Sequence, residues 1–337
     1  MALVGQTYLN LKDKLAQTEG GKVTSTIIDL FAQSSVIMED AIVKECNDGS
    51  SHKTTVRNGL PEVEFRKFYQ GVKNSKGEYT QVTDTTAMLA SYSLVDKALA
   101  DMNGDTNQFR LNEATAHTQA MTNKVQTNIF YGTKGTNGSA FDGLATRYNK
   151  YSNKKDSIGN QVINAGGEGV NNTSIWFVTW GDLHTHLIYP KGTKAGLNHI
   201  DKGVVTAQAP DGNGDFEAYR DYFEWHVGLS VRNYKANVRI ANIDVTKLGT
   251  EDAADLIDLM VSGYYKCNKH AKGGKTVIYV NETIGAWLHK QAMNKNNVNL
   301  AISEYAGTPI VNFLGSPVKI VDQIVDNESA VELDKKA

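Results

Sequence analysis

A long, polar stretch at residues 52–93 most constrains how this chain can fold. Over 62–69, apolar and charged side chains alternate in the pattern of a β-strand, and a second, threonine-rich strand is predicted at 79–86. A basic, glycine-bounded turn at 71–77 separates them. A two-stranded hairpin that buries little is only marginally stable in water. It therefore needs support, either from the edge of its own sheet or from a neighbouring subunit.

A helix of unusual length is the second constraint. Its apolar residues recur at spacings of three, four or seven and form one stripe: Leu111, Ala114, Met121, Val125 and Ile129. This spacing predicts one helix over 106–131. About 25 residues at 1.5 Å each would span ~38 Å, whereas the mean helix has only ~11–12 residues. A helix this long is typical of a scaffold rather than of a compact core.

The remaining segments predict an α+β protein with at least two sheets. Residues 1–20 have few apolar anchors and are predicted to form an extended arm, and 150–173 to form a loop. Further helices are predicted at 25–43, 94–102, 251–266 and 282–293. Strands are predicted at 174–180, 216–225, 229–234, 238–243, 276–280, 309–313 and 318–325.

Charge and cysteine content exclude several classes of protein. Lysine plus arginine number 35 and aspartate plus glutamate 37, so the formal net charge of −2 argues against a generally basic nucleic-acid binder. Cys46 and Cys267 are too far apart to indicate a disulfide framework or a zinc motif, and we expect two reduced thiols. No apolar run approaches the ~20 residues that span a bilayer. The first residues lack a signal-peptide pattern, so we expect assembly in a cytoplasm.

Two patterns were candidates for chemistry. Lys272–Thr276 ends like a phosphate-binding loop, but Lys269 stands where the motif needs glycine, and the segment precedes a strand instead of opening a helix. His184 and His186 would share one face of a strand and could bind zinc together with His199. Such a site still needs an acid or base, for which Asp182 and Asp201 are the nearby carboxylates. A metal-dependent enzyme built on these histidines is therefore one alternative hypothesis.

Short strings along the chain are similar to strings in the major capsid proteins of tailed bacteriophages. Their ordered occurrence from the first residue to about residue 244 makes the resemblance specific. They are MALVGQTYL at 1–9, TTVRNGLP at 54–61, VTDTT at 82–86, VDKALAD at 95–101, FYG at 130–132, FDGL at 141–144 with Arg147 and Tyr148, YPKG at 189–192 and GLSVRN at 228–233.

The resemblance implies the tailed-phage capsid fold of the Hong-Kong-ninety-seven type. This α+β fold has an N-terminal arm, an extended β-hairpin loop, a peripheral domain with a long spine helix, and an axial domain. The implied boundaries are 1–48 for the arm and first helix, 49–93 for the extended loop, 94–159 and 206–244 for the peripheral domain with spine helix 106–131, 160–205 and 245–325 for the axial domain, and 326–337 for a charged tail.

The resemblance also implies a function. We expect a major capsid protein, not an enzyme and without a cofactor, that assembles through pentamers and hexamers into the icosahedral shell around phage DNA. The expected partners are other copies of the chain, a separate scaffolding protein, a portal, a decoration protein and double-stranded DNA on the inner face, with no membrane. The expected location is the virion, assembled in the host cytoplasm. A head-completion or tail ring protein is the second alternative.

The hairpin is the expected contact between subunits. Its polar faces would be matched by charged and hydrogen-bonding groups of a neighbour. The charged residues predicted to lie in this contact are Arg57, Glu62, Glu64, Arg66, Lys67, Lys73 and Lys76. Three glycines, Gly71, Gly77 and Gly104, are predicted hinges that let one chain fit both pentamers and hexamers.

Overall fold

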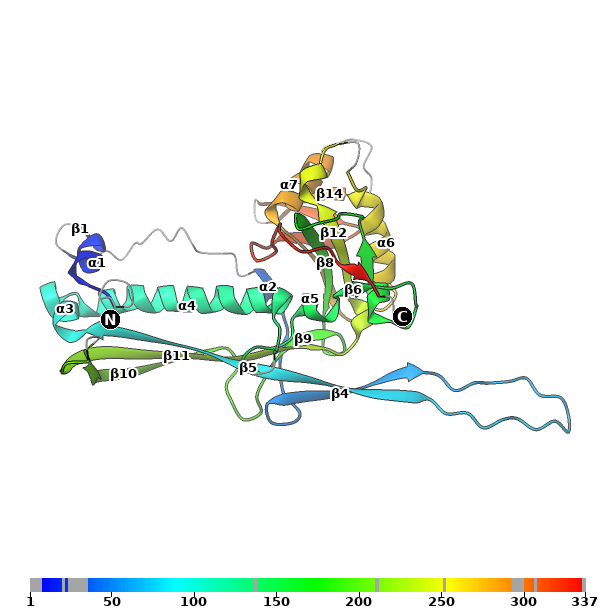
Figure 1. The fold of residues 1–337 in the computed structure, drawn as a ribbon, viewed down its shortest axis with the longest axis horizontal. Coiled ribbons are helices and arrows are strands. Elements are labelled where there is room, and N and C mark those ends of the chain that lie inside the picture. The colour runs from blue at the N-terminus through cyan, green and yellow to red at the C-terminus, as the bar shows by residue number, and fades with distance from the viewer. Residues whose placement is uncertain are drawn as a thin grey trace. The chain divides into compact units, whose positions relative to one another are not determined.

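The computed structural model describes residues 8–19, 22–23, 36–135, 138–209, 212–250, 253–292, 300–305 and 308–334. The chain divides into two compact units. Unit 1 comprises 1–33, 88–125 and 194–227, and unit 2 comprises 34–87, 126–193 and 228–337. Three long elements contribute residues to both units: β5 (Glu78–Asp96), α4 (Thr106–Tyr131) and β11 (Asp215–Val231) (Figure 1).

The long helix occupies the predicted range. α4 is one uninterrupted helix of 26 residues, from Thr106 to Tyr131. In unit 1, Phe109 of this helix packs with Val95, Ala100 and Val23 in a small core. The remaining elements of unit 1 are α1 (Leu11–Ala16), β1 (Thr18–Glu19), β2 (Lys22–Val23), α3 (Lys97–Asp101) and β10 (Leu197–Gln208), which pairs antiparallel with β11.

The arm is not extended throughout, contrary to the prediction. α1 begins with a capping box in which Asn10 and Asp13 each accept a hydrogen bond from the other's backbone N–H. Lys14 of this helix is 2% exposed. Its ammonium donates to the carbonyl oxygens of Leu99, Ala100 and Met102 at 2.7, 2.9 and 2.5 Å. The arm has few apolar residues that could anchor it, and the hydrogen bonds of Lys14 anchor α1 instead.

Unit 2 is built on a mixed sheet with the order β14-β15-β16-β13-β8-β9-β11. All nine residues of β8 are buried, both the apolar run at 175–178 and the polar Asn172, Thr173, Ser174 and Thr179. α6 packs on β12 and β8, and α7 packs on β14, β15 and β16. The strands are β3 (Val43–Glu45), β4 (Ser51–Gly59), β6 (Lys150–Tyr151), β7 (Val162–Asn164), β8 (Asn172–Trp180), β9 (Thr185–Tyr189), β12 (Val238–Asp244), β13 (Lys275–Val280), β14 (Leu300–Tyr305), β15 (Thr308–Phe313), β16 (Ser316–Ile320) and β17 (Glu332–Leu333); the helices are α2 (Val36–Asp40), α5 (Leu144–Arg147), α6 (Leu256–Asn268) and α7 (Glu282–Ala292).

Several predicted elements need correction. The first hairpin strand is β4 at 51–59, not 62–69, where the chain forms no strand. The strands predicted at 216–225 and 229–234 are one continuous strand, β11, and β10 was not predicted. Short strands β6 and β7 lie within the predicted loop 150–173. The predicted helix at 25–43 falls largely outside the described residues, which contain α2 and then β3.

The charged C-terminal tail is attached to unit 2 by a buried ion pair. Glu328 and Arg239 are each 5% exposed in their side chains, and the carboxylate lies 2.8 Å from the guanidinium. Ser174 also donates to this carboxylate. Farther along, β17 pairs in parallel with β6. The tail therefore belongs to the fold of unit 2 as far as residue 334.

Candidate functional site

The candidate site is the β4–β5 hairpin of unit 2. The two strands pair antiparallel from Ser51 opposite Thr85 to Gly59 opposite Glu78. The connecting loop, 60–77, contains no strand and continues beyond the paired region (Figure 1). Threonines and charged residues dominate the paired strands, as predicted for a polar hairpin.

Loop 60–77 exposes four apolar side chains that its alternating sequence pattern did not identify as a surface patch. Val63 and Phe68 are 90% and 95% exposed, and Phe65 and Tyr69 have no measurable cover at all. Tyr69 also has a φ of 66°, a left-handed conformation that bulky side chains rarely adopt. Exposed apolar patches of this kind mark protein interaction sites. Their charged neighbours suggested a strand, so the aromatic residues were missed as candidate contacts.

The seven charged residues predicted for the contact all belong to this hairpin. Arg57 lies on β4, with its guanidinium 5.2 Å from the ring centre of Tyr79. The other six, which lie in loop 60–77, are Glu62, Glu64, Arg66, Lys67, Lys73 and Lys76, and all are exposed. Within the part of the chain that the structure describes, none of the seven forms an ion pair.

The predicted hinge glycines differ in their backbone. Gly104 has a φ of 73°, which favours glycine over any residue with a side chain. Gly71 and Gly77 lie outside the left-handed region. Gly71 has open space where a side chain would be, so nothing in its surroundings requires glycine.

The base of the hairpin is held by a buried carboxylate. Asp84 of β5 forms an ion pair with Arg147 of α5 at 2.7 Å and accepts a hydrogen bond from the backbone N–H of Val231. Arg147 also donates to the carbonyl of Leu229 at 3.1 Å. A side chain at Gly228 would lie 2.6 Å from the carbonyl oxygen of Thr85. Three of the strings that carry the resemblance, at 82–86, 141–148 and 228–233, therefore meet at this base.

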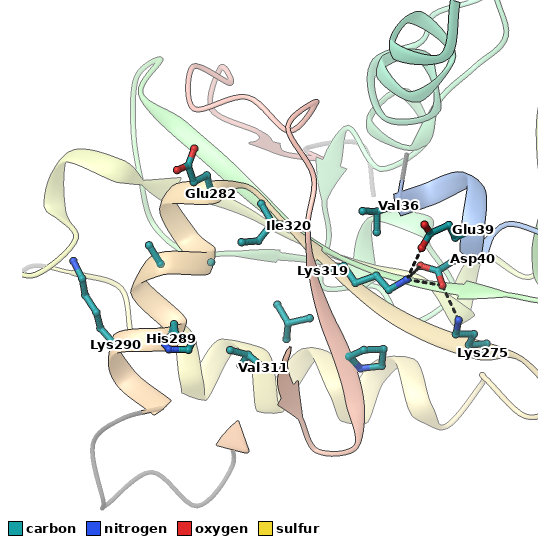
Figure 2. Close-up of a pocket in the computed structure, with 14 residues that line it drawn as sticks. Val36, Glu39, Asp40, Lys275, Glu282, His289, Lys290, Val311, Lys319 and Ile320 are labelled. Atoms are coloured by element: carbon teal, nitrogen blue, oxygen red, sulfur yellow. Dashed lines mark hydrogen bonds and ion pairs between the residues drawn. The ribbon is translucent and has the colours of Figure 1, made fainter. Parts of the chain in front are cut away.

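A second buried carboxylate holds α2 against the sheet beside a groove (Figure 2). Asp40 lies 2.6 Å from the ammonium of Lys275 and 2.8 Å from that of Lys319, and accepts from the Tyr279 hydroxyl at 2.9 Å. Burial would raise the pKa of Asp40, but these hydrogen bonds outweigh it and lower that pKa below its usual value. The adjoining groove, of about 1160 Å³, has Val311 and Ile320 among its apolar lining residues.

The histidines proposed as zinc ligands have separate surroundings. His184 hydrogen-bonds the carbonyl of Lys272 at 2.9 Å, and His186 is fully buried against His52. His199 belongs to unit 1, where it pairs with Asp221 at 2.9 Å. Among the described residues, no group of three or more His, Cys, Asp or Glu has the arrangement of a metal site. The geometry gives the metal-enzyme hypothesis no support.

Cys46 and Cys267 are both buried free thiols in the structure. Burial, together with the carboxylates of Glu45 and Asp84, raises the pKa of Cys46 to about 11.

In the described parts of the chain, no helix has the length and apolar character needed to cross a membrane.

Comparison with known proteins decides the family. The family model for the major capsid protein GP7 matches residues 18–332. The chain belongs to this family of phage major capsid proteins. A chain in the cryo-EM structure of bacteriophage Epsilon15 is 42% identical to this capsid protein, with a TM-score of 0.78 over 98% of this chain and 99% of that one. The predicted family, capsid fold and shell role are confirmed.

More distant comparisons add little. A chain of the bacteriophage JBD30 capsid is 12% identical over 87% of this capsid protein and 92% of that chain, with a TM-score of 0.49, too low to extend the assignment. No curated protein matches the chain. This is therefore the major capsid protein of a tailed-phage shell, located in the virion, and neither alternative function is favoured.

Proposed function

We propose that loop 60–77 of one subunit contacts a second copy of the chain and that its aromatic residues supply most of the binding energy. The exposure of Phe65, Phe68 and Tyr69 supports this proposal, because a soluble monomer gains nothing from presenting three aromatic rings to water. Burying each ring would contribute roughly 1.5–3 kcal/mol.

The charged residues of the hairpin fix the orientation of this contact. Six charged residues flank the aromatic residues in the sequence and form no ion pair within the described chain. They are Glu62, Glu64, Arg66, Lys67, Lys73 and Lys76. Charges at the rim of an interface contribute more to specificity than to affinity. Repeated around rings of pentamers and hexamers, individually modest contacts give a stable shell through multivalency.

The domain roles follow the same assignment. Residues 1–48 are the arm and first helix, 49–93 the extended loop, 94–159 and 206–244 the peripheral domain, 160–205 and 245–325 the axial domain, and 326–337 the tail. The large apolar core around Phe177, Ile240 and Ile278 supports a separately folded axial domain, although β12 contributes to that core as well. Gly71, Gly77 and Gly104 serve as hinges between pentamer and hexamer geometries.

The remaining partners are inferred from the shell role. A separate scaffolding protein directs assembly, a portal occupies one vertex, a decoration protein binds outside, and double-stranded DNA fills the interior. The protein performs no catalysis and needs no cofactor.

Assembly of point variants tests the aromatic contact. The double variant Phe65→Ser/Phe68→Ser is expressed with the neighbouring phage genes and examined by sedimentation and negative-stain microscopy. Folded subunits or capsomers without closed shells are expected. Tyr265→Ser is the matched control, because Tyr265 is also exposed, at 67%, but lies on α6. Normal shells from the double variant, or equal loss of shells in the control, would refute the aromatic contact.

A further inference from the structure

Two histidine side chains are buried against each other at the base of the hairpin. His52 of β4 is 6% exposed and His186 of β9 is 0% exposed. Their ring centres are 5.4 Å apart and their planes are nearly perpendicular, at 86°. None of the four ring nitrogens has a hydrogen-bond partner within the described chain, and neither does the hydroxyl of Ser230, which lies opposite His186 in the sheet. Buried polar groups are nearly always hydrogen-bonded, so this arrangement needs an explanation.

The charged groups that act on the two rings come from several elements. Lys44 of β3 and Arg232, which follows β11, are both paired with Asp182, which precedes β9. On β5, Asp84 is paired with Arg147. Both nearby carboxylates are thus already neutralised by cations. A proton on either imidazole would add a buried positive charge beside these cations without a free counter-ion.

We propose that the His52–His186 pair is an acid-sensitive contact: the neutral rings hold the base of β4 against β9, and protonation of either ring releases it. The contact lies within one subunit, so this inference does not depend on what loop 60–77 binds.

The direction of the pH effect follows from the protonation of each state. Burial, with His52, Arg232 and Lys44 nearby, lowers the pKa of His186 to about 4, and burial also lowers the pKa of His52. Once the base opens, each ring returns to an ordinary pKa of about 6.5. The open state therefore binds more protons, and opening becomes more favourable as the pH falls from about 6.5 to about 4. For His186 alone, the open population rises about thirtyfold between pH 7.5 and pH 5.

Hydrogen exchange of the full-length subunit tests this inference. Exchange is measured by mass spectrometry at pH 7.5 and pH 5, corrected for the intrinsic pH dependence of amide exchange. Peptides covering 51–59 and 185–189 should show the thirtyfold increase in opening, whereas a peptide covering β13 should not. His186→Gln should abolish most of the increase. His289→Gln, which changes a half-buried histidine of α7 in the same unit, should leave it unchanged.

Several outcomes would overturn the proposal. These are equal opening of the hairpin base at both pH values, or a pH response that is as large in His186→Gln as in the wild type. Slower exchange of the same peptides when Zn²⁺ is added at pH 7.5 would show that the rings bind a metal instead. If His186→Gln does not fold, NMR titration of the ring nitrogens in the wild-type subunit decides. A His186 pKa near 4 supports the proposal, and one above 6 refutes it.

Discussion

Neutralising Glu328 should destabilise the capsid subunit more than any other change in its tail. One carboxylate oxygen accepts from Arg239 at 2.8 Å and from Ser174, and the other accepts from the hydroxyl of Tyr131. Burial and the Glu328 carboxylate raise the pKa of Tyr131, so its hydroxyl remains a donor. Arg239 also lies 4.8 Å from the centre of the Trp176 ring, in a region with little access to water.

The expected loss of stability depends on which partner of the Glu328–Arg239 ion pair is removed. Glu328→Gln keeps the shape of the side chain but leaves the Arg239 guanidinium buried without a counter-charge. Breaking a buried pair in this way costs roughly 3–5 kcal/mol. For a unit of this size, a loss of that magnitude lowers the melting temperature by about 6–20 °C. Replacing both partners, in Arg239→Met/Glu328→Met, removes the unpaired charge and should recover part of that stability.

Thermal unfolding followed by circular dichroism measures the effect on the purified, unassembled subunit. Glu332→Gln is the matched control, because Glu332 is an exposed carboxylate four residues along the same tail. Its melting temperature should stay near that of the wild type, since exposed substitutions change stability by about 0.5 kcal/mol or less. The reasoning fails if Glu328→Gln melts within 2 °C of the wild type, or if the double variant is less stable than the single one.

Asp40→Asn should lower the free energy of unfolding by roughly 1–3 kcal/mol at pH 7, measured by urea denaturation. Because the pKa of Asp40 is lowered in the folded protein, its contribution is present above an unfolded pKa of about 3.9 and is lost as the pH falls through the folded value, so the difference between variant and wild type should shrink steadily as the pH is lowered below about 3.9. Lys14→Met removes three hydrogen bonds to backbone carbonyls and should speed chymotrypsin cleavage within 8–19; an unchanged rate would contradict the anchoring role. Gly228→Ala forces a side chain to within 2.6 Å of a carbonyl oxygen and should cost roughly 1–3 kcal/mol, seen as a lower melting temperature. Deleting 70–78 should leave a folded subunit that forms no shells under negative stain, and normal particles would refute that expectation.

Hydrophobic periodicity correctly predicted helices and strands that pack against apolar side chains of other elements. The stripe from Leu111 to Ile129 predicted the range of α4, and the apolar run at 175–178 predicted the strand β8. β13 and α7 were likewise predicted to within a residue at each end. Met121, Val125 and Ile129 of the α4 stripe are buried, whereas Leu111 is 58% exposed, so the spacing predicted the helix correctly but not every residue of its buried face.

Hydrophobic periodicity gave wrong predictions where backbone pairing between strands, and not side-chain packing on a core, determines the strand. The alternation at 62–69 is typical of a strand, but no neighbouring strand pairs with it, and it forms part of an exposed loop. The residues that pair with β5 are the polar ones of β4, whose stability comes from backbone hydrogen bonds along the ladder. β10 was missed for a similar reason, since none of its twelve residues is fully buried.

The buried polar residues of the hairpin base could not be predicted from spacing at all. Asp84 and Arg147 are 63 positions apart in the sequence, and nothing local distinguishes this aspartate from the exposed ones. The strings that resemble capsid proteins nevertheless include both residues, together with Gly228, whose position tolerates no side chain. A buried ion pair and a close backbone approach admit few substitutions, whereas an apolar core accepts many residues of similar volume. Family resemblance in this chain is therefore expected to concentrate where polar and steric constraints are strictest, although the sequence analysis did not name the hairpin base as a site.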